Sequence, residues 1–173
     1  MSQKEMGDVA VRQLEGRVYG MKTAKGIALL QIVAAPAPKS LRLTRICDGF
    51  LPEKYTGNDV LEILNRKELF FMNTCLGFTK NSKLYKEFFV FDKVFDIPRD
   101  VVLPTAYRGY TPYNDGSGFW YYKEAPDWIW QKVGTDPSEL TDEYLSLPPD
   151  SAWSFPRIRE FLESGKAYTE WLY

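Results

Sequence analysis

The run from Ile27 to Val33 constrains the fold more than any other part of the sequence. Six of its seven residues are apolar, and Gln31 is the single exception. A strand with one solvated face alternates apolar and polar residues, whereas a strand covered on both faces is apolar throughout. The run therefore predicts a central strand. Thr23–Gly26, a short turn segment ending in glycine, predicts a hairpin between this strand and one at Val18–Met21.

Shorter segments predict the other elements of a sheet. Leu41–Thr44 alternates apolar and polar residues, which is typical of a half-exposed strand, and Asp48-Gly49 is expected to close it with a turn. Asn58 is a suitable N-cap for a helix that ends at Lys67. Aromatic and apolar runs that are too short for helices predict further strands at 69–72, 88–91, 119–122 and 128–133.

The C-terminal part of the chain is expected to be helical. Asp136 or Thr141 can begin one helix, and Ser154 can cap a second helix that ends at Gly165. Because strands precede helices, the sequence predicts an α+β fold. We expect a strongly bent antiparallel sheet or partial barrel with C-terminal helices.

The length of 173 residues suits a single domain spanning 1–173. Within it, residues 1–15 are expected to be a flexible N-terminal segment. Residues 104–118 are rich in glycine and proline and are expected to form a long loop that binds a ligand or acts as a lid. The polar N-terminus has no signal-peptide core, and no window approaches the ~20 apolar residues of a membrane span. We therefore expect a cytoplasmic protein without a membrane partner.

The absence of histidine excludes several kinds of chemistry. A chain without histidine has no Ser-His or Cys-His nucleophile pair and no imidazole base. The two cysteines, Cys47 and Cys75, are too few for a disulfide framework or a four-sulfur zinc site, and we expect both to be buried. We expect no enzymatic activity, no cofactor and no metal site. A metal-dependent nuclease built around Asp92 and Lys93 is the least favoured alternative.

Charge is distributed unevenly along the chain. Residues 1–123 carry 18 basic and 13 acidic side chains, a net charge of +5, whereas residues 124–173 carry 4 and 10, a net charge of −6. The basic part allows an alternative function as a nucleic-acid-binding domain. Aromatic residues there stand in unbroken apolar runs, which favours a core rather than base stacking. Nucleic acid is therefore the second choice of partner.

Aromatic residues gather near the acidic part. All five tryptophans fall after residue 119, with tyrosines close by. Tryptophan and tyrosine supply stiff contact area at protein interfaces, and clustered carboxylates steer a basic partner. One interpretation is a second half of the core with a solvated acidic helix; the other is a partner-binding surface. The candidate partner-binding residues are Tyr110, Tyr113, Trp128, Trp130, Asp136, Glu139, Asp142 and Glu143.

The order of features resembles a known family. The chain has an early hairpin at 16–32, then an aromatic strand leading into Phe95–Pro98 and Leu103-Pro104, then Phe119-Trp120, and a helical tail with Leu140–Leu145 and Ala152-Trp153. From about Gly16 to Gly165 this order is similar to that of the immunity protein 26 group of bacterial polymorphic toxin systems. The resemblance implies a protein that neutralises a cognate toxin by binding it inside the cell that makes both. An acidic surface would suit a basic toxin such as a nuclease.

Overall fold

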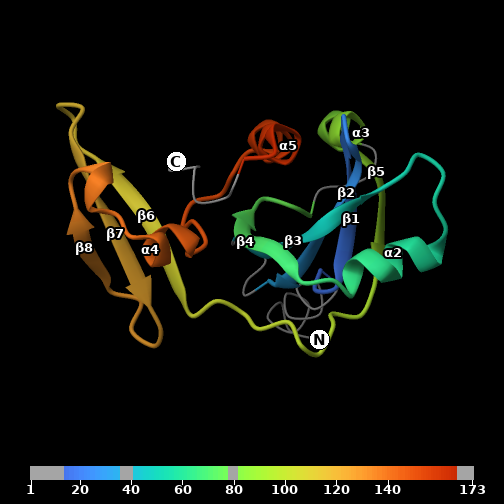
Figure 1. The fold of residues 1–173 in the computed structure, drawn as a ribbon, viewed down its shortest axis with the longest axis horizontal. Helices are drawn as coiled ribbons and strands as arrows, with labels where there is room; N and C mark the ends of the chain where they lie inside the picture. Colours follow the sequence, from blue (N-terminus) through green and yellow to red (C-terminus); the bar gives the residue numbers. More distant parts are fainter. Residues whose placement is uncertain (1–13, 36–40, 78–81, 167–173) are drawn as a thin grey trace, which may run out of the picture. The chain divides into compact units, whose positions relative to one another are not determined.

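The computed structural model describes residues 14–35, 41–77 and 82–166, so most of the expected N-terminal segment lies outside the described residues. The chain divides into two compact units (Figure 1). The five-stranded unit comprises Met1–Val101 and Ala152–Gly165, and the three-stranded unit comprises Val102–Ser151 and Lys166–Tyr173. Each is described by itself below, and the prediction of one domain stays a prediction.

The five-stranded unit is built on an antiparallel sheet. Its strands are β1 (Arg17–Thr23), β2 (Gly26–Ala34), β3 (Arg42–Leu51), β4 (Glu68–Thr74) and β5 (Phe89–Val94), and their order is β4-β3-β2-β1-β5. The predicted hairpin and central strand are confirmed, because β2 pairs with β1 and lies in the middle of the sheet. All seven residues of the apolar run are buried. The mixed α+β class is also confirmed, whereas the bent sheet or partial barrel remains a prediction.

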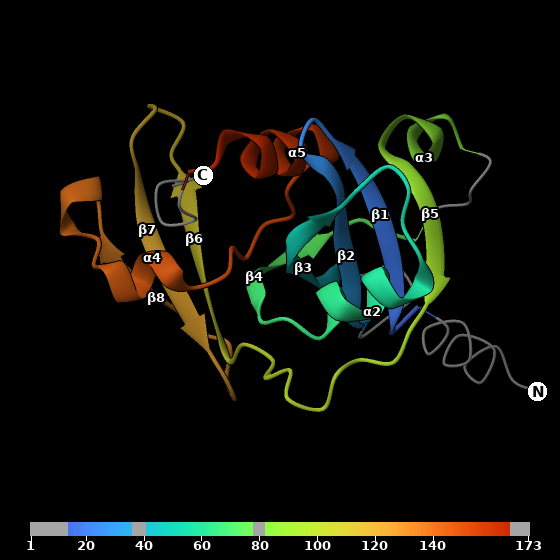
Figure 2. The same cartoon turned by 45° about the vertical axis from the view of Figure 1, so that its right-hand side comes forward.

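Helices cover both faces of this sheet (Figure 2). Helix α2 (Gly57–Leu64) packs on the face that carries Val18 and Leu29. Helix α5 (Phe155–Ser164) packs on the other face, where Phe161 contacts Phe70 at a ring-centroid distance of 4.8 Å. As predicted, α5 follows Ser154 and ends at Gly165. The sheet is therefore buried on both sides, as the apolar run requires.

The start of α2 differs from the prediction. The N-cap is Thr56 rather than Asn58, and the helix ends at Leu64. The Thr56 hydroxyl accepts a hydrogen bond from the Asp59 amide, and the Asp59 carboxylate accepts one from the Thr56 amide at 2.6 Å. This reciprocal capping box gives an acceptor to the amides of Thr56 and Asp59, so the helix begins directly after Thr56. Helix α3 (Lys83–Phe88) was not predicted and contains the first residue of the expected strand at 88–91.

Strand β3 is longer and more buried than predicted. Asp48-Gly49 forms a bulge rather than a closing turn, because Ile46 pairs with Leu30 whereas Phe50 pairs with Ala28. Residues 42–47 are all buried, so the expected half-exposed strand is wrong. Their alternating polar residues find partners inside the protein instead of facing water.

A buried polar network explains why Gln31 of β2 and Arg45 of β3 are polar. Arg45 is 1% exposed. Its Nε donates to Oε1 of Gln31 at 2.8 Å, and its Nη2 donates to the carbonyl oxygen of Leu64 at 2.6 Å. Nε2 of Gln31 donates in turn to the carbonyl oxygens of Phe95 and Asp96, each at 3.3 Å. The network joins the two central strands to the end of α2 and to the chain after β5.

The two cysteines have different environments. Cys47 lies in the core beside α2, and burial raises the pKa of its thiol to about 11. Cys75 is exposed, so the prediction of burial is wrong for this residue. It directly follows the last residue of β4, where the chain leaves the sheet.

The three-stranded unit is an antiparallel meander. Its strands are β6 (Ala106–Pro112), β7 (Gly118–Glu124) and β8 (Trp130–Gly134), in that order. A short 3-10 helix, η1 (Pro137–Glu139), and helix α4 (Asp142–Ser146) follow. Among the described residues, none of the helices has the length and apolarity needed to cross a membrane.

The expected long loop at 104–118 is wrong, because β6 occupies its residues 106–112. Gly109 suggests a loop by composition but has another role. It lies opposite Tyr121 in the sheet, and a Cβ at this position would stand 2.3 Å from the Tyr121 ring. The glycine is therefore required by the close approach of a ring, not by a turn. The connecting turn is limited to Tyr113–Ser117, where the Tyr113 amide donates to the Ser117 carbonyl oxygen at 2.6 Å.

Candidate functional site

The two faces of the three-stranded sheet carry different side chains. Because side chains alternate along a strand, Phe119 and Tyr121 of β7 point to one face and Trp120 and Tyr122 to the other. The first face is called the aromatic face here, and no helix within residues 102–151 packs on it. The second, called the helix face, is covered by α4, whose Tyr144 ring contacts Trp120 at 6.5 Å. The side chains of the aromatic face are Tyr107, Tyr113, Phe119, Tyr121, Trp128 and Trp130.

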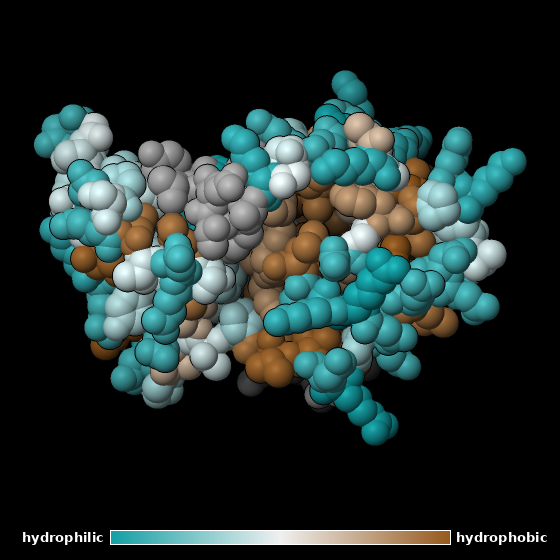
Figure 3. Space-filling model, viewed as in Figure 1, coloured by the Kyte–Doolittle hydropathy of each residue, from teal (hydrophilic) through white to brown (hydrophobic). Residues whose placement is uncertain are grey.

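The aromatic face presents three large exposed rings on a packed base. Trp130 is 56% exposed and stacks on buried Phe119 at 5.3 Å with an interplanar angle of 14°. Tyr113, 51% exposed, contacts the same phenylalanine at 5.6 Å. Trp128, 43% exposed, contacts Tyr107 at 5.6 Å. Figure 3 shows apolar surface lying among hydrophilic residues on this unit. Each exposed ring is thus held by an aromatic neighbour while a large part of its surface remains free for contact.

The structure brings three of the four predicted aromatic anchors together and separates the fourth. Tyr113, Trp128 and Trp130 lie on the aromatic face, although Trp128 precedes β8 and has a φ of 55° instead of a strand conformation. Tyr110 lies on the helix face, where its ring contacts Trp120 at 4.8 Å. The expected strand at 128–133 therefore begins two residues late, because the chain after β7 first turns through Trp128, whose amide donates to the Glu124 carbonyl oxygen.

A polar group borders the aromatic face. Asp150 accepts a hydrogen bond from the Tyr121 hydroxyl at 2.9 Å and forms an ion pair with Nζ of Lys123 at 2.6 Å. Burial, followed by the hydrogen bond to Asp150, raises the pKa of Tyr121 to about 12. Tyr121 therefore remains a neutral donor at physiological pH, and the aromatic face keeps a fixed polar edge.

The stability of the three-stranded unit is expected to fall as the pH rises from 10 to 12. Burial also raises the pKa of Tyr144 to about 12. A tyrosine whose folded pKa lies above its unfolded value of 10.0 binds its proton more tightly in the folded state, so its contribution is complete below pH 10 and is lost as the pH approaches 12. The measurement is the urea midpoint against pH, followed by tyrosinate absorbance. Tyr121→Phe should reduce the decline; a decline as large as that of the wild-type protein would contradict this assignment.

The four predicted acids lie beyond β8 and serve local structure as well as surface charge. Asp136 and Glu139 form a capping box around η1, in which the Glu139 carboxylate accepts from the amides of Thr135 at 2.7 Å and Asp136 at 3.0 Å. Hydrogen bonds lower the pKa of both carboxyl groups. Asp142 and Glu143 occupy the first turn of α4, where a negative charge is favourable. All four side chains are exposed, so their charges are available to a partner.

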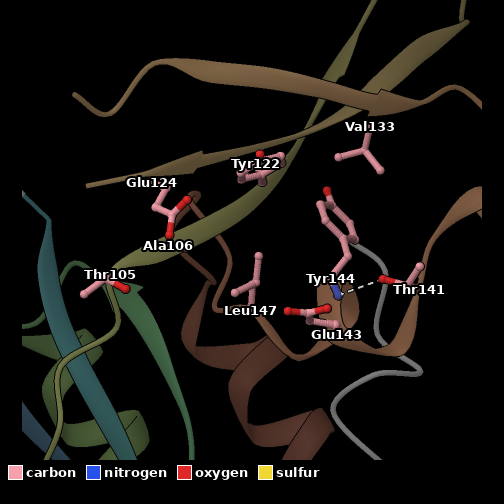
Figure 4. A pocket seen from close by; sticks show the side chains of 9 residues that line it. All are labelled: Thr105, Ala106, Tyr122, Glu124, Val133, Thr141, Glu143, Tyr144 and Leu147. Carbon is pink, nitrogen blue, oxygen red and sulfur yellow. Dashed lines mark hydrogen bonds between the residues drawn. The ribbon is translucent and has the colours of Figure 1, made fainter. Parts of the chain in front are cut away.

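A pocket of about 520 Å³ lies within the three-stranded unit (Figure 4). Strand residues supply one side and the α4 region supplies the other, and in the view of Figure 4 the Tyr144 ring points from α4 toward the strands. Glu143 is the one predicted site residue among those that line it. The lining residues are Thr105, Ala106, Tyr122, Glu124, Val133, Thr141, Glu143, Tyr144 and Leu147.

Sequence reasoning missed several residues of this unit. Tyr107, Phe119 and Tyr121 belong to the aromatic face, and Tyr122 and Tyr144 line the pocket. The period-two pattern of β7 is the signal that separates Phe119 and Tyr121 from Trp120 and Tyr122. No sequence signal marks Tyr144, which reaches the pocket only because α4 folds back on the strands. Its hydroxyl lies 2.8 Å from the Tyr121 carbonyl oxygen and 3.0 Å from that of Gly109.

Some of the residues behind the two alternative functions are buried in the five-stranded unit. Arg42, Arg45 and Phe88 are buried, whereas the basic residues Arg66, Lys67, Lys83 and Lys86 are exposed. Asp92, which the nuclease alternative requires, is buried and bonded to Arg17. In the ranges 14–35, 41–77 and 82–166 there is no group of three or more cysteine, aspartate or glutamate side chains placed to hold a metal ion.

Comparison of the chain with protein-family models, with curated proteins and with solved structures found no match.

Proposed function

We propose that this chain is a non-catalytic binding protein that holds a protein partner on the aromatic face, and that the partner is a toxin which it neutralises. The observation that carries the proposal is the set of three exposed rings, Tyr113, Trp128 and Trp130, fixed on one side of a small sheet. Tryptophan and tyrosine dominate binding energy at protein interfaces, especially where neighbours hold them in place. A prepacked ring also loses little conformational entropy on binding.

The charge of the unit supports a basic partner. Between Val102 and Ser151 there are three basic and eight acidic residues, a net charge of −5. Asp136, Glu139, Asp142 and Glu143 contribute half of the acidic residues and are exposed. Exposed charges of this kind raise the association rate and make it depend on salt, while adding little to the final affinity. The acids therefore attract the partner and the rings hold it.

The resemblance to the immunity protein 26 group supports a toxin as the partner. Neutralisation by direct contact requires a surface that matches the toxin and requires no reacting groups. The aromatic face supplies such a surface. The acidic unit fits a toxin that is itself basic, as an enzyme acting on nucleic acid would be.

The proposal predicts that a gene next to that of this chain encodes a toxin domain, and this domain is the probe for the test. Wild-type protein should restore growth of cells that express the toxin domain and should bind it in calorimetry. Trp128→Ala removes an exposed ring without uncovering Phe119 and is expected to weaken binding about 10- to 100-fold. Leu69→Ala is the matched control, because Leu69 is an exposed apolar residue of the five-stranded unit. Failure of the wild-type protein to bind, or equal binding by Trp128→Ala, would overturn the proposal.

A further inference from the structure

Two carboxylates that line the pocket are not used by the rest of the described chain. Glu124 ends β7 and Glu143 lies in the first turn of α4. Within the described ranges, neither carboxylate forms a hydrogen bond or an ion pair. Asp150, by contrast, is already paired with Lys123. The pocket therefore holds negative charge that is free to interact with a ligand.

The remaining lining favours a cation that carries an apolar stem. Tyr122 and Tyr144 supply aromatic rings, which attract cations to their faces. Val133 and Leu147 supply apolar contacts for an alkyl chain. The hydroxyl of Tyr144 is held by the backbone of β6 and β7, so its ring has a fixed position in the wall.

Arg108 is the nearby basic residue to weigh against this charge. It is 2% exposed, and its Nε donates to the carbonyl oxygen of Leu147 at 2.9 Å. It is not among the residues that line the pocket. Two of the lining residues are acidic and none is basic, so the lining carries a net negative charge.

We propose that this pocket receives an arginine side chain of the protein partner. The inference rests on the proposed function, since it assigns a side chain of that partner. A guanidinium group stacks on a tyrosine ring and pairs with a carboxylate at the same time, which an ammonium group does less well. The volume of about 520 Å³ falls within the range of small-ligand pockets, ~300–1,000 Å³, and accommodates the whole side chain.

The pocket also lies near the ring that binds the partner. The Trp128 amide donates to the Glu124 carbonyl oxygen at 2.9 Å, so the turn after β7 joins an exposed ring of the aromatic face to a wall of the pocket. A partner segment in contact with Trp128 therefore needs to pass only this turn to place a side chain beside Glu124.

The first experiment uses blocked arginine, N-acetyl-arginine amide, as the probe and needs no partner. Nuclear magnetic resonance titration should shift signals of Tyr122, Val133 and Tyr144, and the neutral analogue N-acetyl-citrulline amide should not. The double variant Glu124→Gln and Glu143→Gln is expected to weaken binding at least about tenfold, since hydrogen bonds to charged groups contribute ~1.5–3 kcal/mol. Glu87→Gln is the control, because Glu87 is an exposed acid of α3 in the five-stranded unit and does not line the pocket.

The second experiment measures capture of the toxin domain by the same variants. A higher dissociation constant for the double variant, with unchanged capture by Glu87→Gln, supports the inference. If wild-type protein captures the toxin and the double variant captures it equally well, the inference is overturned while the proposed function stands. If the toxin is not captured but blocked arginine binds, the proposed function fails and the pocket is shown to bind a cation that does not come from this partner, which also overturns the inference.

Discussion

Arg45→Ala is expected to lower the free energy of unfolding by about 3–5 kcal/mol. The guanidinium is buried, and its two bonds go to Gln31 and to the carbonyl oxygen of Leu64. Removing it leaves both acceptors without a donor in the core and creates a cavity where the side chain was. The loss is a large part of the total stability of a domain, which is about 5–15 kcal/mol. Urea unfolding followed by circular dichroism measures it.

Two further variants separate the network from the arginine itself. Arg45→Met restores most of the volume but neither hydrogen bond, so it should be more stable than Arg45→Ala and less stable than the wild-type protein. Arg66→Ala is the control, because Arg66, just beyond the end of α2, forms an exposed pair with Glu62, and such pairs contribute at most about 0.5 kcal/mol. A loss for Arg45→Ala as small as that for Arg66→Ala would show that the network does not hold the central strands.

Gly26→Ala is expected to destabilise the five-stranded unit by at least about 2 kcal/mol. Gly26 begins β2 with a φ of 125°, a backbone conformation that other residues rarely adopt. A Cβ there would stand 2.5 Å from the carbonyl oxygen of Leu51. That oxygen belongs to the neighbouring central strand, so relief requires a shift of the backbone rather than of a flexible side chain. The melting temperature should fall accordingly.

Gly57→Ala provides the comparison for this change. Gly57 is the first residue of α2, and nothing lies within 4 Å of the position that its Cβ would occupy. Alanine there reduces the entropy of the unfolded chain without steric cost, so its melting temperature should stay equal or rise slightly. Equal melting temperatures for the two variants would contradict the role assigned to Gly26.

The strongest elements of the fold follow from local patterns, and the errors come from partners that are distant in sequence. The run at 27–33 predicts the central strand because only a doubly covered strand is so apolar. Arg45 suggests an exposed face because its acceptors, Gln31 and Leu64, are 14 and 19 residues away. Gly109 suggests a loop because the ring that needs its space lies on the next strand. The roles of Arg45 and Gly109 therefore depend on contacts that form only in the folded chain.

Part of the candidate site can likewise be predicted from residue type alone, and the rest depends on the fold. Residue type alone identifies Tyr113, Trp128 and Trp130, since tryptophan and tyrosine near an acidic segment are typical of a binding surface. Strand register decides that Tyr110 is not with them, because it pairs opposite Trp120 and shares its face. The sequence does not predict the pocket, since Glu124 and Glu143 line it together only when α4 packs against the strands.

Trp130 is at once the most exposed ring of the aromatic face and the cover of Phe119. A substitution of Trp130 that alters recognition would also expose the Phe119 ring to water. Tyr113 also contacts Phe119, whereas Trp128 contacts Tyr107 instead. During divergence from one partner to another, selection would therefore preserve Trp130 and Tyr113 and permit substitutions at Trp128, so that specificity changes at the ring that does not cover Phe119.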